Sequence, residues 1–95
     1  MTNNDTLRHT RTMQTLERVY EYDMSSVVNR FHKDYGVSAK KSNEYEVELK
    51  RYLTLCAFSD INYGIAGGLD YLWHTFIIYT RDYMLFCQEY FGHFI

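Results

Sequence analysis

The sequence predicts an all-α fold, a small single domain of four to five short helices that ends in a helical hairpin. Three observations support this prediction. Residues 69–92 repeat apolar side chains twice at the spacing of an amphipathic helix. Three glycines within residues 58–68 argue against a strand there and favour a shaped loop. The length of 95 residues suits one domain with one hydrophobic core.

The C-terminal pair of helices gives the strongest signal in the chain. The first predicted helix has an apolar stripe formed by Leu69, Leu72, Trp73, Phe76 and Ile77. The second repeats the pattern with Tyr83, Phe86, Cys87, Tyr90 and Phe91. Thr80 can cap the second helix through its hydroxyl, and Gly92 can end it in the left-handed conformation. We expect Trp73 at the centre of the core, and the hairpin packed against a helix over residues 43–57.

The first half of the chain predicts two short helices. One covers residues 6–23, follows a frayed stretch over residues 1–5, and has an apolar stripe formed by Met13, Leu16, Val19 and Tyr20. Ser25 or Ser26 can cap the other, and Gly36 can end it. Its inward-facing residues are predicted to be Val27, Val28 and Phe31.

A third helix follows a linker over residues 37–41. Ser42 or Asn43 can cap this helix, since Asn43 and Glu46 have the spacing of a capping box. Its side opposite the core carries the pair Glu46 and Lys50, one turn apart, which we expect to face solvent. Its buried stripe is predicted to be Leu49, Tyr52, Leu53 and Cys56.

Composition and charge exclude some classes of function. Twelve acidic and ten basic side chains give a net charge of −2, without the basic stripe that phosphate-backbone binding needs. No signal peptide and no apolar run of membrane-spanning length is visible, so we expect a cytoplasmic protein that does not insert into a membrane. Aromatic residues make up 18% of the chain, which suits a protein-binding surface as well as a small core.

No set of residues predicts an enzyme or a bound cofactor. The two cysteines, Cys56 and Cys87, lie on apolar helix faces, where reduced buried thiols are the usual state. Zinc binding by His74 with Cys87 and His93 is an alternative by residue type, although the spacing of these residues is poor. A structural His74 at the border of the core is the simpler interpretation.

Apolar residues outside the predicted stripes are the candidates for contact with a partner. Tyr63 and Ile65 lie in the glycine-containing loop, and apolar loop residues often mark contact surfaces. Tyr71, Ile78 and Met84 fall on the predicted outer faces of the hairpin. For any one of them, an ordinary exposed apolar residue is an equally good interpretation.

The C-terminal motif resembles the glycine-rich domain-containing protein-like family, which has longer plant members and small bacterial and phage-type members. The matching residues are Asp70, Trp73, His74, Thr80, Arg81, Tyr83, Phe86, Cys87, Phe91 and Gly92. The similarity extends over residues 27–95 and implies a shared helical fold without implying an activity. Many members have a histidine where Phe76 stands and more after the final Phe-Ile, so a histidine site of that family would lack ligands here.

These observations together predict a non-enzymatic protein-binding module. One concrete version is a phage or mobile-element protein that inhibits a host defence complex, as an anti-CRISPR protein does. A metal-binding or metal-stabilised protein using His74 is the alternative. Nucleic-acid binding is disfavoured, and a second copy of the chain remains open as a partner. The basic residues that nucleic-acid binding would use are Arg8, Arg11, Arg18, Lys40 and Lys41.

Overall fold

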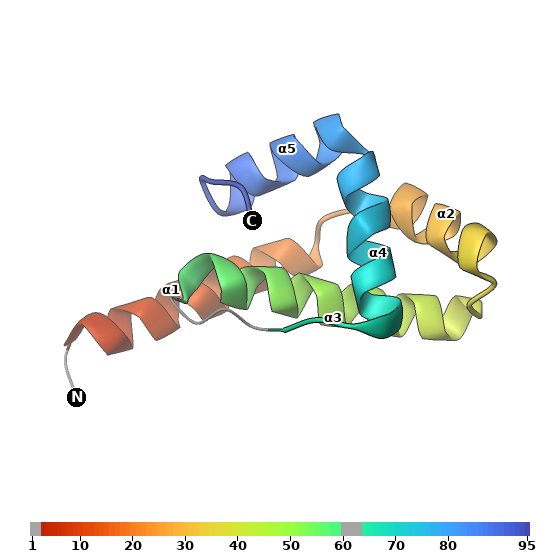
Figure 1. The fold of residues 1–95 in the computed structure, drawn as a ribbon. Coiled ribbons are helices and arrows are strands. Elements are labelled where there is room, and N and C mark those ends of the chain that lie inside the picture. The colour runs from red at the N-terminus through yellow and green to blue at the C-terminus, as the bar shows by residue number, and fades with distance from the viewer. Residues whose placement is uncertain (1–2, 60–63) are drawn as a thin grey trace.

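The computed structural model describes residues 3–59 and 64–95, and all regular structure in these two ranges is helical, which confirms the predicted fold class. The ranges contain five helices: α1 (Asn3–Tyr20), α2 (Ser25–Tyr35), α3 (Ala39–Phe58), α4 (Gly67–Ile78) and α5 (Thr80–Tyr90) (Figure 1). The prediction that residues 1–5 are frayed is partly wrong, because helix α1 already includes residues 3–5.

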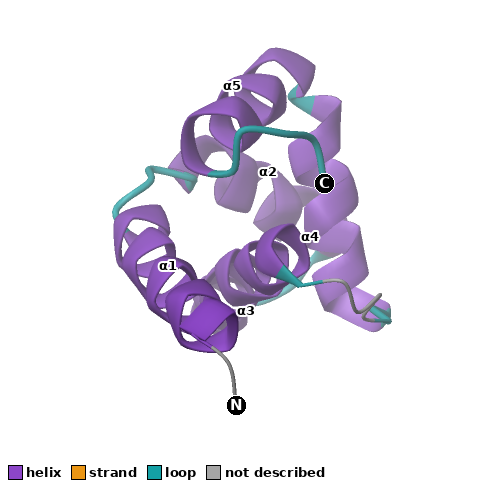
Figure 2. Ribbon diagram, turned by 90° about the vertical axis from the view of Figure 1, so that its left-hand side faces the viewer, coloured by secondary structure: helices purple, strands orange, loops and turns teal. Residues whose placement is uncertain are grey.

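The helices pack around α3 and α4. Helices α1 and α3 lie side by side along the long dimension of the molecule (Figures 1 and 2). Helix α4 crosses both α2 and α3, whereas α5 leaves the end of α4 at a corner and reaches α1 (Figure 1). We expected both C-terminal helices to pack against α3. In the structure, only α4 of the two has close backbone contacts with α3.

Aromatic rings from α2, α4 and α5 are the largest buried side chains of the core. Phe31, Phe76 and Phe86 are fully buried. The ring of Phe76 meets those of Tyr83 and Phe86 edge-on, with centroid distances of 5.0 and 5.1 Å. Such contacts stabilise beyond the area that they bury. Other buried apolar residues are Val19, Met24, Val27, Val28, Leu49, Leu53, Leu72 and Cys87.

The expectation that Trp73 occupies the centre of the core is wrong. Phe76, one turn later, takes that place, and Trp73 is half-buried beside it. The indole N–H of Trp73 donates a hydrogen bond to the hydroxyl of Tyr83 at 3.1 Å. The ring of Tyr52 meets the indole edge-on at 5.5 Å. This position gives the indole N–H the hydrogen-bond partner that a buried tryptophan usually has.

The position of Lys50 differs most from its prediction. The side chain was expected in solvent but is 3% exposed. Its Nζ atom donates to the carbonyl oxygens of Tyr20 at 3.2 Å and Tyr22 at 2.7 Å, and to Oε2 of Glu46 at 2.8 Å. Because an ammonium group has three donors, all of them are used. Lys50 of α3 thus caps the carbonyl end of α1.

Helix α1 buries fewer side chains than its apolar stripe predicts. It ends at Tyr20 instead of residue 23, and Val19 is its fully buried residue. Met13 and Tyr20, two members of the predicted apolar stripe, are exposed. The hydroxyl of Tyr20 instead accepts a hydrogen bond from Nε of Arg51 at 2.8 Å.

Two of the predicted helix starts are wrong. Helix α3 begins at Ala39, because Oγ of Ser38 accepts a hydrogen bond from the backbone N–H of Lys41 at 3.1 Å. Ser42 and Asn43, the two predicted caps, both lie inside the helix, and Ser42 is buried. No side-chain hydrogen bond from Ser25 or Ser26 caps α2. Oδ1 of Asp23 accepts instead from the backbone N–H of Ser25 at 2.9 Å.

Glycines define the ends of three helices. Gly36 ends α2 as predicted, with a φ of +65° that glycine adopts without strain. The predicted loop over residues 58–68 is shorter, because Phe58 belongs to α3, and Gly67 and Gly68 belong to α4. A Cβ atom on Gly68 would lie 2.7 Å from the ring of Tyr45, so a larger residue here would require that ring to move.

One residue, Tyr79, separates α4 from α5. Thr80 was expected to cap α5 but is its first residue. The Thr80 hydroxyl donates to the carbonyl oxygens of Ile77 at 3.2 Å and Ile78 at 3.4 Å, which lie at the end of α4. Gly92 lies just after α5 with a φ of +77°, and its N–H donates to the Cys87 carbonyl at 2.9 Å. Its predicted role at the helix end is confirmed.

Candidate functional site

The outer side of α4 presents apolar side chains to solvent. Tyr71 is 50% exposed and Ile78 is 77% exposed. They lie seven residues apart, which is two helical turns, so they share one side of the helix. The exposed His74 lies between them. We call Tyr71, His74 and Ile78, together with Tyr35 of α2, the α4 surface.

Tyr35 anchors the α4 surface to the core. Its ring stacks on that of Tyr71 with a centroid distance of 5.1 Å and an interplanar angle of 11°. The other neighbour of Tyr35 is the buried Phe31, at 5.3 Å. Two exposed rings are therefore held in place before any partner arrives, which lowers the entropic cost of binding. Tyr35 was not among the predicted contact residues, although its position one turn after Phe31 places it at the edge of the core.

The histidine of the α4 surface has an acidic neighbour. Nε2 of His74 lies 3.4 Å from Oδ2 of Asp70, one turn earlier on the same helix, and both side chains are open to solvent. A pair this exposed contributes little to stability. The prediction that His74 sits at the border of the core is wrong, because its side chain is 63% exposed.

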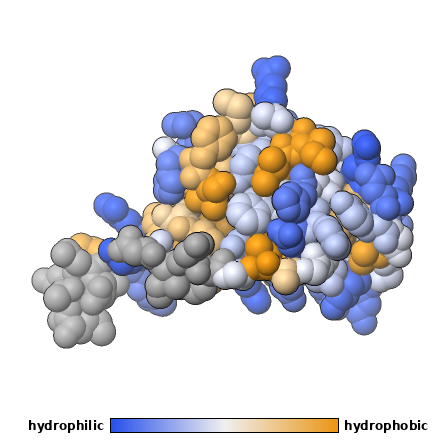
Figure 3. Space-filling model, in the orientation of Figure 1, coloured by the Kyte–Doolittle hydropathy of each residue, from blue (hydrophilic) through white to orange (hydrophobic). Residues whose placement is uncertain are grey.

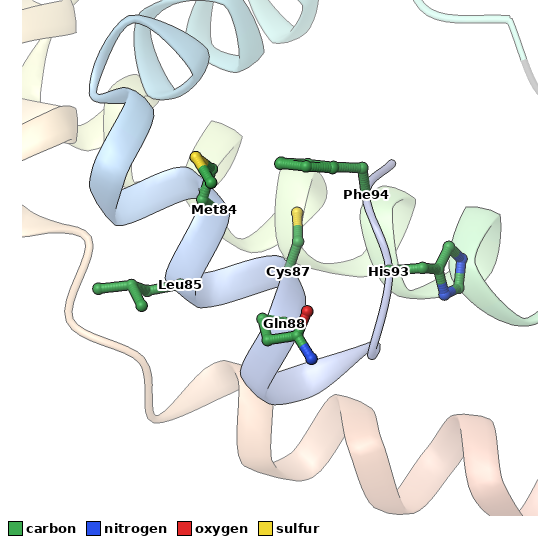
Figure 4. A pocket seen from close by; sticks show the side chains of 6 residues that line it. All are labelled: Met84, Leu85, Cys87, Gln88, His93 and Phe94. Atoms are coloured by element: carbon green, nitrogen blue, oxygen red, sulfur yellow. The ribbon is translucent and has the colours of Figure 1, made fainter.

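A second apolar region lies between α5 and the residues that follow it. It contains a pocket of about 180 Å³ lined by Met84, Leu85, Cys87, Gln88, His93 and Phe94. In Figure 4 the ring of Phe94 reaches toward Met84, and the thiol of Cys87 points between them. Burial raises the pKa of this thiol, so Cys87 is an apolar lining group and not an activated nucleophile.

Tyr83 holds the C-terminal residues over α5 and so shapes this pocket. Its hydroxyl donates to the carbonyl oxygen of Ile95 at 2.9 Å while it accepts from the indole of Trp73. The ring of Phe94 stacks on that of Tyr83 with a centroid distance of 6.4 Å. One buried tyrosine therefore connects α4, α5 and the end of the described chain.

The structure does not bring the proposed zinc ligands together. His74 pairs with Asp70, and the ring of His93 points away from Cys87 (Figure 4). Within residues 3–59 and 64–95, no three His, Cys, Asp or Glu side chains are close enough to hold a metal ion. Neither cysteine of these ranges forms a disulfide.

The five residues predicted to contact a partner have different surroundings. Tyr71 and Ile78 lie together on the α4 surface, and Met84 lines the α5 pocket. Ile65 is half-buried against the core and offers less surface than expected. Tyr63 lies outside the described residues. Figure 3 shows apolar side chains gathered over α4 and α5 on this face, with hydrophilic ones between them.

The basic residues that nucleic-acid binding would use are spread over the molecule. Arg8 and Arg11 line a groove of about 330 Å³ beside Phe58 and Leu7. Arg18 lies over the ring of Tyr90 at 5.2 Å, and Lys41 over that of Tyr45 at 5.1 Å. Cations in separate contacts of this kind do not form the continuous stripe that tracks a phosphate backbone.

A family model described as UCP032817-like matches residues 11–95, a range that includes the α4 surface and the α5 pocket. No curated protein and no solved structure matches the chain. These comparisons do not test the resemblance to the glycine-rich domain-containing protein-like family, which stays a prediction. In the part of the chain that the structure describes, no helix is both long and apolar enough to span a membrane.

Proposed function

The chain belongs to the UCP032817-like family, and we propose that it is a non-enzymatic protein-binding module that contacts its partner through the α4 surface. The observation that carries this proposal is the 77% exposure of Ile78 on the side of α4 that also carries, two helical turns earlier, one of two stacked, half-exposed tyrosines. Rigid aromatic rings next to an aliphatic side chain form the usual centre of a protein interface.

The chemistry of the α4 surface defines the partner in general terms. Tyr35 and Tyr71 combine apolar faces with hydroxyl groups, so they suit a protein surface that has an apolar centre and hydrogen-bonding groups around it. His74 within this surface pairs with Asp70 one turn earlier, and exposed charged groups of this kind influence the association rate more than the affinity.

The specific role that we propose for this module is that of a cytoplasmic inhibitor from a phage or mobile element. The partner is then a host defence complex, and the chain acts as an anti-CRISPR protein does, by occupying a surface that the complex needs. A chain of 95 residues with a preformed contact surface suits such a role. We do not propose zinc binding, because the three candidate ligands are held apart.

The test is affinity capture from a bacterial host with three forms of the immobilised chain. We expect the wild type to retain a stable partner and Ile78→Glu to bind it about ten-fold more weakly or worse, since a charge replaces a central apolar contact. Val47→Glu is the control, because Val47 is a 40% exposed aliphatic residue on α3. Equal capture by the Ile78 and Val47 variants would exclude the α4 surface as the contact region.

A further inference from the structure

The outer side of α5 combines exposed apolar side chains with the charged side chains of Arg81, Asp82 and Glu89, and Asp82 is the one that the helix dipole favours at its position. Leu85 is 58% exposed and Met84 is 47% exposed. Arg81 lies one turn before Leu85 and Glu89 one turn after it, and both are exposed. Arg81, Leu85 and Glu89 thus form one ridge, about 12 Å long, along the helix. We call this ridge together with Met84 the α5 stripe.

Both charges of the α5 stripe lie where the helix itself disfavours them. Arg81 is in the first turn, where the helix dipole favours anions, and Glu89 is in the last turn, where it favours cations. Within the described residues, neither side chain forms an ion pair. The stability of α5 therefore gives no reason for either charge.

We propose that the α5 stripe is the contact surface of a homodimer, in which a second copy of this chain packs its α5 antiparallel to the first. Along the helix the stripe presents a cation, then a leucine, then an anion. When two such helices lie antiparallel, the cation of each helix faces the anion of the other. A two-fold axis near Leu85 places Arg81 of each copy opposite Glu89 of the other. The two leucines meet at the axis, with Met84 beside them.

The exposed Phe94 enlarges this surface. Its ring is 60% exposed and lines the same pocket as Met84 and Leu85. The pocket of about 180 Å³ has room for an apolar side chain from the second copy. Even so, the α5 stripe with Phe94 has five residues, whereas each side of a stable interface has roughly 20–30 residues. The dimer is therefore weak, with a dissociation constant on the order of 10–100 μM.

This inference is independent of the proposed function. The α4 surface uses α2 and α4, whereas the dimer uses α5 and the residues after it. An Ile78 variant that loses its partner still dimerises, and an Arg81 variant that stays monomeric still binds the partner. The two proposals can therefore fail separately.

Sedimentation velocity of the purified chain tests the dimer, from micromolar to millimolar concentrations at low salt. We expect a reversible monomer–dimer equilibrium for the wild type. Arg81→Glu and Glu89→Arg should each weaken it at least about ten-fold, because both ion pairs become repulsive. The double variant Arg81→Glu with Glu89→Arg should dimerise as the wild type does, since the pairs are restored with their signs exchanged.

Mixing the two single variants gives the sharpest outcome. One variant carries two acidic ends and the other two basic ends, so neither should pair with itself while the mixture should form a heterodimer. Both substitutions place charges at the helix ends that the dipole favours, so loss of the dimer cannot be assigned to unfolding. Circular dichroism of each variant verifies this.

Leu85→Lys should abolish the dimer, whereas Leu55→Lys, at a 45% exposed leucine on α3, should leave it intact. Three results would overturn the proposal: a wild type that stays monomeric at millimolar concentration, single charge variants that dimerise as well as the wild type, or a mixture of the two that stays monomeric.

Discussion

At the scale of single residues, Lys50 shows how one side chain can join distant parts of the chain. Its ammonium group is the donor for two backbone carbonyls at the end of α1 and for Glu46 on its own helix. A buried charge is tolerated only with such complete pairing. The sequence shows the pair with Glu46, but not the carbonyl groups that pull Lys50 inward, because those lie 28 and 30 residues earlier.

Lys50→Met should destabilise the protein because it keeps most of the aliphatic stem and removes the donor. We expect a loss of about 2–3 kcal/mol in the free energy of unfolding, measured by urea denaturation. Lys41→Met is the matched control. Its Nζ lies 3.6 Å from Glu44 with both side chains about half exposed, so its loss should change the free energy by less than about 1 kcal/mol. Equal losses would contradict the capping role of Lys50.

The raised pKa values of several tyrosines predict how the free energy of unfolding changes at alkaline pH. Burial raises the pKa of Tyr22, Tyr83 and Tyr90, and burial with a hydrogen bond to Cys56 raises the pKa of Tyr52 to about 12. The unfolded chain loses these protons near pH 10, whereas the folded chain keeps them. Stability should therefore be unaffected by these groups below about pH 10 and fall between about pH 10 and 12.

The measurement is the free energy of unfolding as a function of pH, with tyrosinate absorbance as the second signal. Tyr52→Phe should make the fall shallower, because one proton less is released on unfolding. An unchanged slope in this variant would show that the phenol of Tyr52 ionises equally in the folded and unfolded chains.

At the scale of helices, the corner between α4 and α5 is fixed from two sides. Phe76 fills the inside of the corner against Tyr83 and Phe86. On the outside, Trp73 donates to Tyr83, whose hydroxyl holds the carbonyl of Ile95. The apolar spacing of residues 69–92 predicts both helices, but it does not tell which aromatic residue lies deepest.

Truncation of Trp73 and of Phe76, the two aromatic residues of α4 that contact Tyr83, should therefore cost stability in the reverse order of their size. Phe76→Ala removes a fully buried ring and should cost about 3–5 kcal/mol. Trp73→Ala removes a half-buried ring and one hydrogen bond, and should cost about half as much. Thermal and urea unfolding measure both, and a larger loss for Trp73→Ala would place the tryptophan at the centre after all.

The starts of the helices were less predictable than their existence. Ser38 and Ser42 are both acceptable caps by local sequence, and the burial of Ser42 decides between them. That burial depends on how α3 packs on the other helices. Gly36 and Gly92 were predictable because the left-handed conformation at a helix end depends on the residue itself.

At the scale of the whole molecule, the candidate contact surface was predictable only in part. Tyr71, Ile78 and Met84 are exposed as the helix periodicity predicts. Tyr71 and Ile78 lie on one surface and Met84 on another because the chain turns a corner at Tyr79. The apolar spacing of the sequence does not predict this corner. Tyr35 joins the α4 surface through a contact between residues 36 positions apart (71 − 35 = 36). Such contacts depend on the tertiary fold.

For the whole molecule, the central proposal is that the α4 surface binds a partner protein. Site-specific photo-crosslinking in the complex with the captured partner tests this claim most directly. A photoreactive phenylalanine analogue replaces Ile78 in one sample and Val47 in another. The account predicts a covalent product with the partner from position 78 and none from position 47. Crosslinking from position 47 alone would place the partner on α3 and contradict the account.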